Sequence, residues 1–298
     1  MAEPGIGALA RRFMALLMLV ASGLAHAAGA VQLTDDRGVV VRLAQPPQRI
    51  VSLLPSLTES VCELGRCGQL VGVDRYSDYP RSVRSLPRLG GGLDPNVEAV
   101  VALRPDVVLI AASSRAVQRL ESLGLKVVTL EPRSHADVRR VLAQLAALLE
   151  VPNALRVWRA IDAGVDAAAQ SLPPAAKNLR VYFEVGRGPY AASEASFIGE
   201  TLARLGVKNI VAGDLGPFPQ INPEFVVRAD PDLIMIGEAS APGLALRPGW
   251  SRMRAVRDHR VCLFSPQESD VLVRPGPRMA QAARLMARCI AGTGLAAK

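Results

Sequence analysis

The residues of this chain best suited to hold a ligand are polar and aromatic side chains in four short loops and one glycine run. They are Ser56, Arg75, Tyr76, Gly92, Arg187, Tyr190, Asp270 and Arg274. Such groups donate hydrogen bonds, pair with charges and stack on flat surfaces, which suits a large polar ligand with a planar face. We expect Tyr76 to make the main aromatic contact. Asp270 and Arg274 suit either ligand contact or a structural ion pair.

The chain lacks a pattern typical of catalysis or of metal binding. Beyond residue 27 it has two histidines, His135 and His259, and neither has Ser, Cys or carboxylate neighbours at triad or metal-ligand spacing. We therefore expect both at the surface, no metal and no resident cofactor. The run Gly90-Gly91-Gly92 is not a dinucleotide-binding motif. The sequence favours a binding protein over an enzyme.

Strands and helices alternate at short spacing, which is typical of parallel sheets built from βαβ units. After a hairpin over 31–49, strands are expected at 49–56, 70–74, 106–111, 125–130, 179–185, 208–212, 232–237 and 260–265. Helices are expected at 57–65, 96–103, 116–123, 135–149, 154–171, 197–205, 223–228 and 277–291. The segment 268–274 is expected to be a loop. Ligands of such sheets bind beyond the carboxyl ends of the strands, where the four loops should meet.

The helix predicted over 154–171 is longer than its neighbours and lies between two similar halves. Its apolar residues recur at helical spacing, and Pro173-Pro174 ends it. We predict an α/β protein of two similar lobes, with mainly parallel sheets, joined by this one helix and enclosing a ligand cleft. The boundaries are 28–150 for the first lobe, 151–174 for the linking helix and 175–298 for the second lobe. A single helix as hinge predicts a small closure motion.

One phrase occurs twice, once in each half. Residues 94–110 read DPNVEAVVALRPDVVLI, and residues 220–236 read QINPEFVVRADPDLIMI. Glu98 and Glu224 occupy equivalent positions, each at the start of a predicted helix. A carboxylate at this position can simply stabilise the helix N-terminus. Its occurrence on both lobes fits better with docking onto a partner that has two-fold symmetry.

Residues 1–27 have the layout of a secretory signal. Arg11 and Arg12 precede an apolar run, and Ala25-His26-Ala27 forms a small-x-small cleavage site. We expect cleavage near Ala27 and export to the periplasm; the alternative is an uncleaved signal anchor. The net charge of +8 becomes +7 without Arg11, Arg12 and Glu3. The basic residues are scattered, which argues against nucleic-acid binding.

Four cysteines in an exported chain are candidates for disulfides. Cys62 and Cys67 lie five residues apart around a predicted helix end, where Gly65 allows a local bridge. Cys262 in a strand and Cys289 in the last helix could form a second bridge. Free, buried thiols are the alternative for that second pair.

Several segments together resemble the helical-backbone (class III) periplasmic substrate-binding proteins of ABC importers, which carry cobalamin, haem and ferric siderophores. They are PPQRIVSLLPSLTE, RYSDYP, NVEAVVALRPDVVL, GWSRMRAVRDHRV and RPGPR. The resemblance covers nearly the whole chain after the signal, and the RYSDYP loop is most similar to the cobalamin-binding branch. It implies that Tyr76, Asp270 and Arg274 line the ligand cleft. It also implies that Glu98 and Glu224 dock onto arginines of the two permease subunits.

The chain departs from this branch in the placement of tryptophan. Members of the branch can have tryptophans around the cleft, whereas here Gly92 and Ala111 are small, and Trp158 and Trp250 lie on predicted core elements. The expectation is a monomeric periplasmic protein that delivers cobalamin or a related corrinoid to an ABC permease dimer. Haem remains an alternative with Tyr76 or Tyr190 as axial ligand. A ferric siderophore paired with Arg75 and Arg187 is another, and a chelatase-like enzyme is the alternative of a different class.

Overall fold

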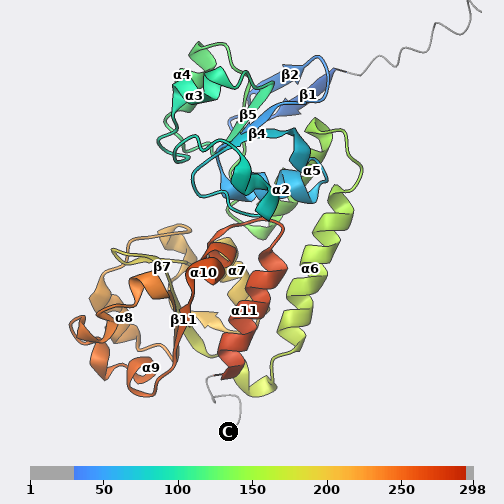
Figure 1. Cartoon of the computed structure of the whole chain (residues 1–298). Coiled ribbons are helices and arrows are strands. Elements are labelled where there is room, and N and C mark those ends of the chain that lie inside the picture. Colours follow the sequence, from blue (N-terminus) through green and yellow to red (C-terminus); the bar gives the residue numbers. More distant parts are fainter. Residues whose placement is uncertain (1–29, 293–298) are drawn as a thin grey trace, which may run out of the picture.

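The computed structural model describes residues 30–292 and has two α/β lobes, one above the other in Figure 1. The predicted signal and its cleavage site lie outside the described residues. No helix in the described part of the chain is long and apolar enough to cross a membrane. The predicted fold class is confirmed.

The first lobe contains a four-stranded parallel sheet in the order β4-β3-β5-β6. Its strands are β3 (Ile50–Ser52), β4 (Leu70–Val73), β5 (Val107–Ile110) and β6 (Val127–Thr129). Its helices are α2 (Pro55–Glu63), α3 (Val97–Ala102), α4 (Val117–Ser122) and α5 (His135–Leu148). β3, β5 and β6 are buried along their whole length, which explains their continuous Val, Leu and Ile runs. The antiparallel hairpin β1 (Val31–Thr34) and β2 (Val40–Leu43) packs its apolar face against the same core.

The second lobe repeats this plan with a mixed sheet in the order β11-β10-β7-β8, and β9 pairs with β7. The strands are β7 (Arg180–Gly186), β8 (Tyr190–Ala191), β9 (Lys208–Asn209), β10 (Leu233–Gly237) and β11 (Val261–Phe264). The helices are α7 (Phe197–Arg204), α8 (Pro223–Ala229), α9 (Arg254–Arg257), α10 (Pro266–Val273) and α11 (Met279–Gly292). Short 3-10 helices occur in both halves of the chain. In the first half they are Cys67–Gln69 and Arg81–Ser85, and in the second half they are Pro174–Ala176, Gly213–Leu215, Glu238–Ser240, Leu244–Leu246 and Trp250–Arg252.

Two expectations for this lobe were wrong. The segment expected to be a loop at 268–274 is mostly helix α10, which begins with a capping box between Ser265 and Glu268. The strand expected at 208–212 has only the two residues of β9, because the Asn209 side chain bonds the Ala192 carbonyl and the Val211 N–H and turns the chain.

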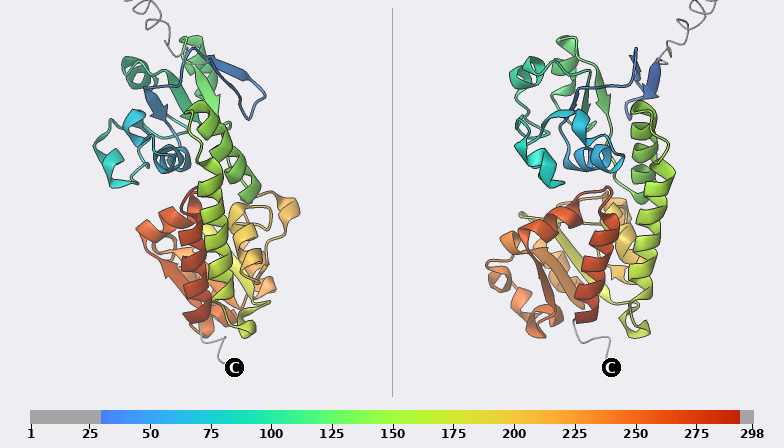
Figure 2. Two further views of the ribbon diagram at one scale, coloured as in Figure 1. Left: turned by 90° about the vertical axis from the view of Figure 1, so that its right-hand side faces the viewer. Right: turned by 45° about the vertical axis from the view of Figure 1, so that its right-hand side comes forward.

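Helix α6 (Ala154–Gln170) runs along one side of the molecule and joins the lobes (Figure 2). It packs against α5 of the first lobe and α11 of the second. Gly164 allows a close approach to α11, since a Cβ at this position would lie 2.5 Å from the Ala280 Cβ. This contact fixes the linking helix to the second lobe.

The repeated phrase forms the same structure in both lobes. Asp106 accepts a hydrogen bond from the Arg49 N–H at 2.8 Å, and Asp232 accepts one from the Arg180 N–H at 2.9 Å. Each aspartate N–H in turn bonds the carbonyl of the same arginine at 2.8 Å. The aspartates therefore join the start of β5 to β3 and the start of β10 to β7.

Both predicted disulfides are present: Cys62–Cys67 closes the end of α2, and Cys262–Cys289 joins β11 to α11. The second bridge ties a strand to a helix that covers it, and the alternative of free thiols for this pair is therefore wrong.

Candidate functional site

A cavity of about 340 Å³ lies between the lobes at the carboxyl ends of the first sheet. This volume is within the range typical of small-molecule pockets. The cavity is lined by Leu53, Leu54, Pro55, Ser56, Asp74, Tyr76, Gly92, Leu93, Ala111, Ser113, Glu131, Pro132, Arg133, Phe197, Pro217, Phe218, Val273 and Pro275. Its wall is mainly apolar with a few polar groups, so it can enclose a flat apolar ligand and orient it.

Every strand of the first sheet contributes to this cavity just after it ends. Ser56 follows β3, Tyr76 follows β4, Ala111 follows β5 and Glu131 follows β6. Because the strands are parallel, their carboxyl ends lie on one edge and bring these residues together. Three of the predicted ligand residues, Ser56, Tyr76 and Gly92, therefore line one cavity.

The second lobe closes the cavity with aromatic and apolar residues that the sequence analysis did not identify. Phe197 begins α7, and Phe218 lies in the loop between the 3-10 helix Gly213–Leu215 and α8. Their rings pack edge to face with centroids 5.9 Å apart. The sequence signal for Phe197 was only its position at the start of a predicted helix. Phe218 has no local pattern that distinguishes it from other loop residues.

Tyr76 is held by its backbone while its ring stays 60 % exposed. Its N–H bonds Asp74 Oδ2 at 2.9 Å, and its carbonyl accepts a hydrogen bond from Arg274 Nη2 at 2.9 Å. The Arg75 guanidinium lies 5.8 Å from the ring centroid. The phenol ring is thus presented to the cavity from a fixed loop and remains free for a ligand.

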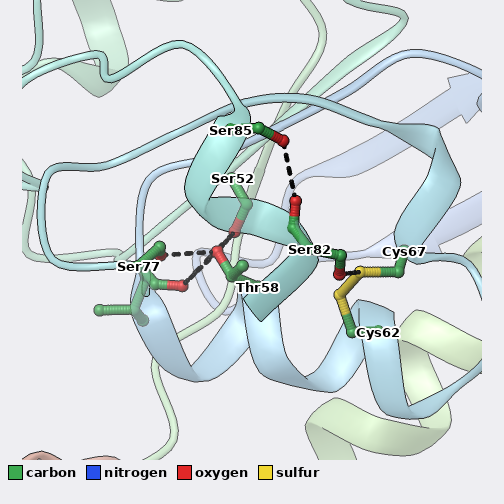
Figure 3. Close-up of a disulfide and its surroundings, with 8 residues drawn as sticks. Ser52, Thr58, Cys62, Cys67, Ser77, Ser82 and Ser85 are labelled. Atoms are coloured by element: carbon green, nitrogen blue, oxygen red, sulfur yellow. Dashed lines mark hydrogen bonds between the residues drawn. A yellow bond between two sulfur atoms is a disulfide. The ribbon is translucent and has the colours of Figure 1, made fainter. Parts of the chain in front are cut away.

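A chain of buried hydroxyl groups lies beneath this loop (Figure 3). Thr58 Oγ1 bonds both Ser52 Oγ and Ser77 Oγ at 2.8 Å. Ser77 Oγ in turn donates to Asp74 Oδ1. Burial raises the pKa of the Asp74 carboxyl above its usual value, although Ser77 and the Tyr76 N–H partly oppose this shift. The chain connects β3, α2 and the loop after β4, and so stabilises the wall on which Tyr76 is mounted.

Gly92 is required by a close approach of two backbone segments. A Cβ at this position would lie 2.6 Å from the Leu53 carbonyl oxygen, which is closer than atoms of real side chains come. The Gly92 carbonyl also accepts a hydrogen bond from Ser114 Oγ at 2.6 Å. The small residue that departs from the resembled branch is thus explained by packing against the end of β3.

Below the cavity, Arg274 crosses from the second lobe to the first. It is 6 % exposed and bonds Glu59 at 3.1 Å, Asp78 at 2.7 Å and Asp270 at 2.9 Å. Arg278 adds a second bond to Glu59 at 2.5 Å. Burial alone would raise the pKa of Asp78, but the Arg274 hydrogen bond and charge outweigh it and hold the pKa below its usual value. These ion pairs hold the lobes together at the floor of the cleft.

The other predicted ligand residues do not line this cavity. Arg274 and Asp270 belong to the ion pairs below it, and Arg75 pairs with Asp94 at 2.8 Å beside it. Arg187 donates to the Ala239 carbonyl at 3.0 and 2.5 Å, and Tyr190 lies in β8. A ligand role for these residues stays a prediction.

His135 was expected at the surface, and this expectation was wrong. It is 9 % exposed, and its Nε2 lies 2.9 Å from Thr201 Oγ1 and 3.2 Å from the Phe197 carbonyl on α7. Its Nδ1 lies 3.5 Å from Arg204 Nη1, so the contacts fit a neutral ring protonated on Nε2. Burial lowers the pKa of His135 below its usual value. The residue is a second contact between the lobes.

Glu98 and Glu224 are both exposed, in the first turns of α3 and α8. Both helices are capped by an asparagine side chain: Asn96 accepts from the Ala99 N–H, and Asn222 accepts from the Glu224 N–H. The helix ends are therefore already capped, and both carboxylates remain available at the surface.

A larger hollow of about 690 Å³ lies between α5 and α6, lined by residues such as Ala143, Leu155 and Trp158. All its lining residues lie on α5, α6 or the segment between them, none of them at the carboxyl end of a strand, and few of them are polar. The smaller cavity between the lobes is therefore the candidate ligand site. Within residues 30–292, no cluster of His, Cys, Asp and Glu could hold a metal ion.

Comparison with known proteins places this architecture in a family. Residues 50–268 match the family model described as "Periplasmic binding protein". An uncharacterized ABC transporter substrate-binding lipoprotein of Bacillus subtilis is 29 % identical over 275 residues, which cover 87 % of this chain and 85 % of that protein.

Two further similar proteins carry names that state a ligand. A vitamin B12-binding protein of Pectobacterium carotovorum is 28 % identical over 251 residues, covering 80 % of this chain and 86 % of that protein. The crystal structure of a periplasmic heme-binding protein from Pseudomonas aeruginosa has a TM-score of 0.67 and 27 % identity, and covers 81 % of this chain and 91 % of that one. The matches extend over most of both partners in each case.

Proposed function

We propose, on the premise that this chain belongs to the periplasmic binding protein family, that it delivers cobalamin or a related corrinoid to an ABC importer. Family members are substrate-binding proteins of transport systems, and two of the proteins similar to this chain are named for binding vitamin B12 and heme. In this proposal the protein is exported, monomeric and without catalytic activity.

The observation that carries the proposal is the cavity between the lobes. Tyr76 enters it from the first lobe, while Phe197 and Phe218 close it from the second. Aromatic faces on both sides suit a flat ring system. The cavity is smaller than a whole corrinoid, so one edge of the ring would enter it and the exposed Tyr76 and Leu93 would flank the remainder.

Charge favours a corrinoid over an anionic ligand. The cavity contains the carboxyl groups of Asp74 and Glu131, and its cation Arg133 already pairs with Glu131 at 3.3 Å. The edge of a corrinoid carries mostly neutral carboxamides, whereas porphyrins carry carboxylates and many ferric siderophores are anionic. The carboxyl groups already accept bonds from Ser113, Ser77 and the Tyr76 N–H, and no unpaired cation among the described lining residues is left for an added carboxylate.

Haem is the second candidate, and the position of one residue favours it. A haem iron needs an axial ligand, and the phenol of Tyr76 is exposed within the cavity. Tyr190, the other tyrosine considered for this role, lies outside the cavity. Haem would therefore depend on Tyr76 as its axial ligand, supported by the similarity to a heme-binding protein.

We further propose that Glu98 and Glu224 dock the loaded protein onto the two subunits of the permease. They are exposed, lie at equivalent positions of the two lobes and are not needed as helix caps. One carboxylate on each lobe fits a partner with two equivalent basic patches.

The experiment that tests the ligand is calorimetric titration of residues 28–298 with cyanocobalamin, dicyanocobinamide, haemin and a ferric siderophore in parallel. We expect one-to-one binding of the two corrinoids. Binding of haemin or of the siderophore alone would contradict the corrinoid proposal and leave a carrier of a different ligand. Binding of none of the four would contradict both candidates.

A further inference from the structure

The hydroxyl group of Ser56 is buried at the wall of the cavity without a partner. Ser56 is 2 % exposed, and its Oγ has no hydrogen bond within the described residues. Its neighbour on the same helix, Ser60, bonds the Ser56 carbonyl through its own Oγ at 2.7 Å. Because a buried hydroxyl without a partner costs about 1–3 kcal/mol, the Ser56 hydroxyl is suited to a partner that arrives in the cavity.

The N-terminus of α2 places a second donor beside this hydroxyl. The N-cap residue is Leu54, which has no side-chain oxygen, and Pro55 has no N–H. The N–H groups of Leu57 and Thr58 both bond the Leu54 carbonyl at 3.0 Å. In the described residues this leaves the Ser56 N–H as the free donor of the first turn. A helix N-terminus with free donors attracts an oxygen acceptor.

Acceptors line the same cavity as these donors. The half-buried carboxyl group of Glu131, which is bonded to Arg133, contributes acceptor oxygens, while Asp74 in the same wall is fully buried and bonded to Ser77 and the Tyr76 N–H. A carboxamide matches both kinds of group, because its oxygen accepts hydrogen bonds and its NH₂ donates them. A carboxylate would match only the donors and would be repelled by the carboxyl groups.

We propose that Ser56 and the N-terminus of α2 form the subsite that receives a carboxamide oxygen of the ligand. This inference rests on the proposed corrinoid function, since the corrin ring is edged by carboxamides. It assigns a role to the one group that the structure leaves both buried and unpaired at the ligand cavity.

The test compares Ser56→Ala with Ser60→Ala, the same change one turn later on the same helix. In the ligand-free protein, Ser56→Ala should leave the melting temperature unchanged or raise it, because it removes an unpaired buried hydroxyl. Ser60→Ala should lower the melting temperature, because it breaks a buried hydrogen bond. Calorimetric titration with cyanocobalamin should show an affinity loss of roughly 3- to 10-fold for Ser56→Ala, the loss of about one hydrogen bond, and none for Ser60→Ala.

Dicyanocobinamide identifies the acceptor, since it keeps ring carboxamides and lacks the phosphate of cyanocobalamin. Ser56→Ala should lower the affinity for both ligands by the same factor. A loss confined to cyanocobalamin would assign the subsite to the phosphate and overturn the inference. The inference would also be overturned if Ser56→Ala left the affinity unchanged, or if it lowered the melting temperature of the ligand-free protein as Ser60→Ala does. If the unmodified protein binds neither corrinoid, the proposed function fails and the inference fails with it.

Discussion

Arg274 and Glu59, which are 215 positions apart in the chain, form a buried ion pair of 3.1 Å that joins the two lobes. Their side chains are 7 % and 2 % exposed. Arg274 also bonds Asp78 and the Tyr76 carbonyl, so the same guanidinium positions the loop that presents Tyr76 to the cavity. The contact between the lobes and the ligand-contact loop thus share one residue.

Glu59→Gln should destabilise the protein by about 3 kcal/mol, because it removes the carboxylate that the largely buried guanidinium of Arg278 pairs with and leaves Arg274 with only Asp78 and Asp270. Arg274→Gln should lower the free energy of unfolding by less, because Glu59 keeps its bond to Arg278. The double variant should lose less stability than the sum of the single variants, because the two residues share an interaction. Urea unfolding measures all three. Additivity to within about 0.5 kcal/mol would show that the pair is not coupled.

The stability of the protein should fall as the pH drops below about 6.5, the value at which an unfolded-state histidine takes up a proton. Burial lowers the pKa of His135 in the folded state, and Arg204 opposes a positive charge there, although Glu200 and Asp162 favour it. Between the two pKa values the unfolded chain binds more protons than the folded one, so acidification favours unfolding. The loss should stop once the pH passes the folded-state pKa.

Melting curves of the unmodified protein and of His135→Gln, recorded from about pH 5 to about pH 7.5, test this expectation. The two limits lie on either side of the reference pKa of histidine. The glutamine variant should have a flatter pH dependence. His259→Gln is the control, because His259 is exposed and should leave the dependence unchanged. An equal slope in His135→Gln and in the unmodified protein would show that His135 does not titrate on unfolding.

Tyr76→Ala should weaken ligand binding by about 1–3 kcal/mol, the usual cost of removing an aromatic contact at the centre of a binding site. Tyr190→Ala is the matched control, since Tyr190 is similarly exposed and lies outside the cavity. Titration calorimetry with cyanocobalamin provides the comparison. Tyr76→Phe should keep most of the affinity for a corrinoid; a large loss in this variant would point to use of the phenol oxygen, as expected for haem.

Replacing Glu98 and Glu224 together by arginine should abolish transport and leave ligand affinity nearly unchanged. Both residues are exposed and neither lines the cavity, so the reversal of charge should act on the permease contact alone. Ligand uptake by vesicles that contain the permease measures transport, and titration measures affinity. Glu63→Arg, another exposed position, serves as the control for charge. A collapse of ligand affinity would place the two glutamates in the ligand site instead.

The sequence by itself determined the fold class, the long helix between two lobes and the repeated Asn-x-Glu phrase. It also predicted the local Cys62–Cys67 disulfide, whereas Cys262 and Cys289 were left as either a second disulfide or free thiols until the structure joined them. These features depend on local signals: apolar runs, turn residues and spacing. The grouping of Ser56, Tyr76 and Gly92 also followed from sequence, because loops after parallel strands meet at one edge of the sheet. Helix α10 (Pro266–Val273) was missed, because its apolar pattern is short and its start depends on the capping box of Ser265 and Glu268.

Only the tertiary structure decided how the second lobe meets the first. Phe197 and Phe218 reach the cavity because α7 and the loop before α8 face the first lobe, and no local pattern encodes that approach. His135 is buried because the ends of α5 and α7 touch. Arg274 lies in ion pairs below the cavity because Glu59 and Asp78, far away in sequence, are brought to it by packing of the lobes. Contacts of this kind join segments that are far apart in the chain. The type of each residue indicates what interaction it can make, but the spacing of residues in the sequence does not indicate its partner.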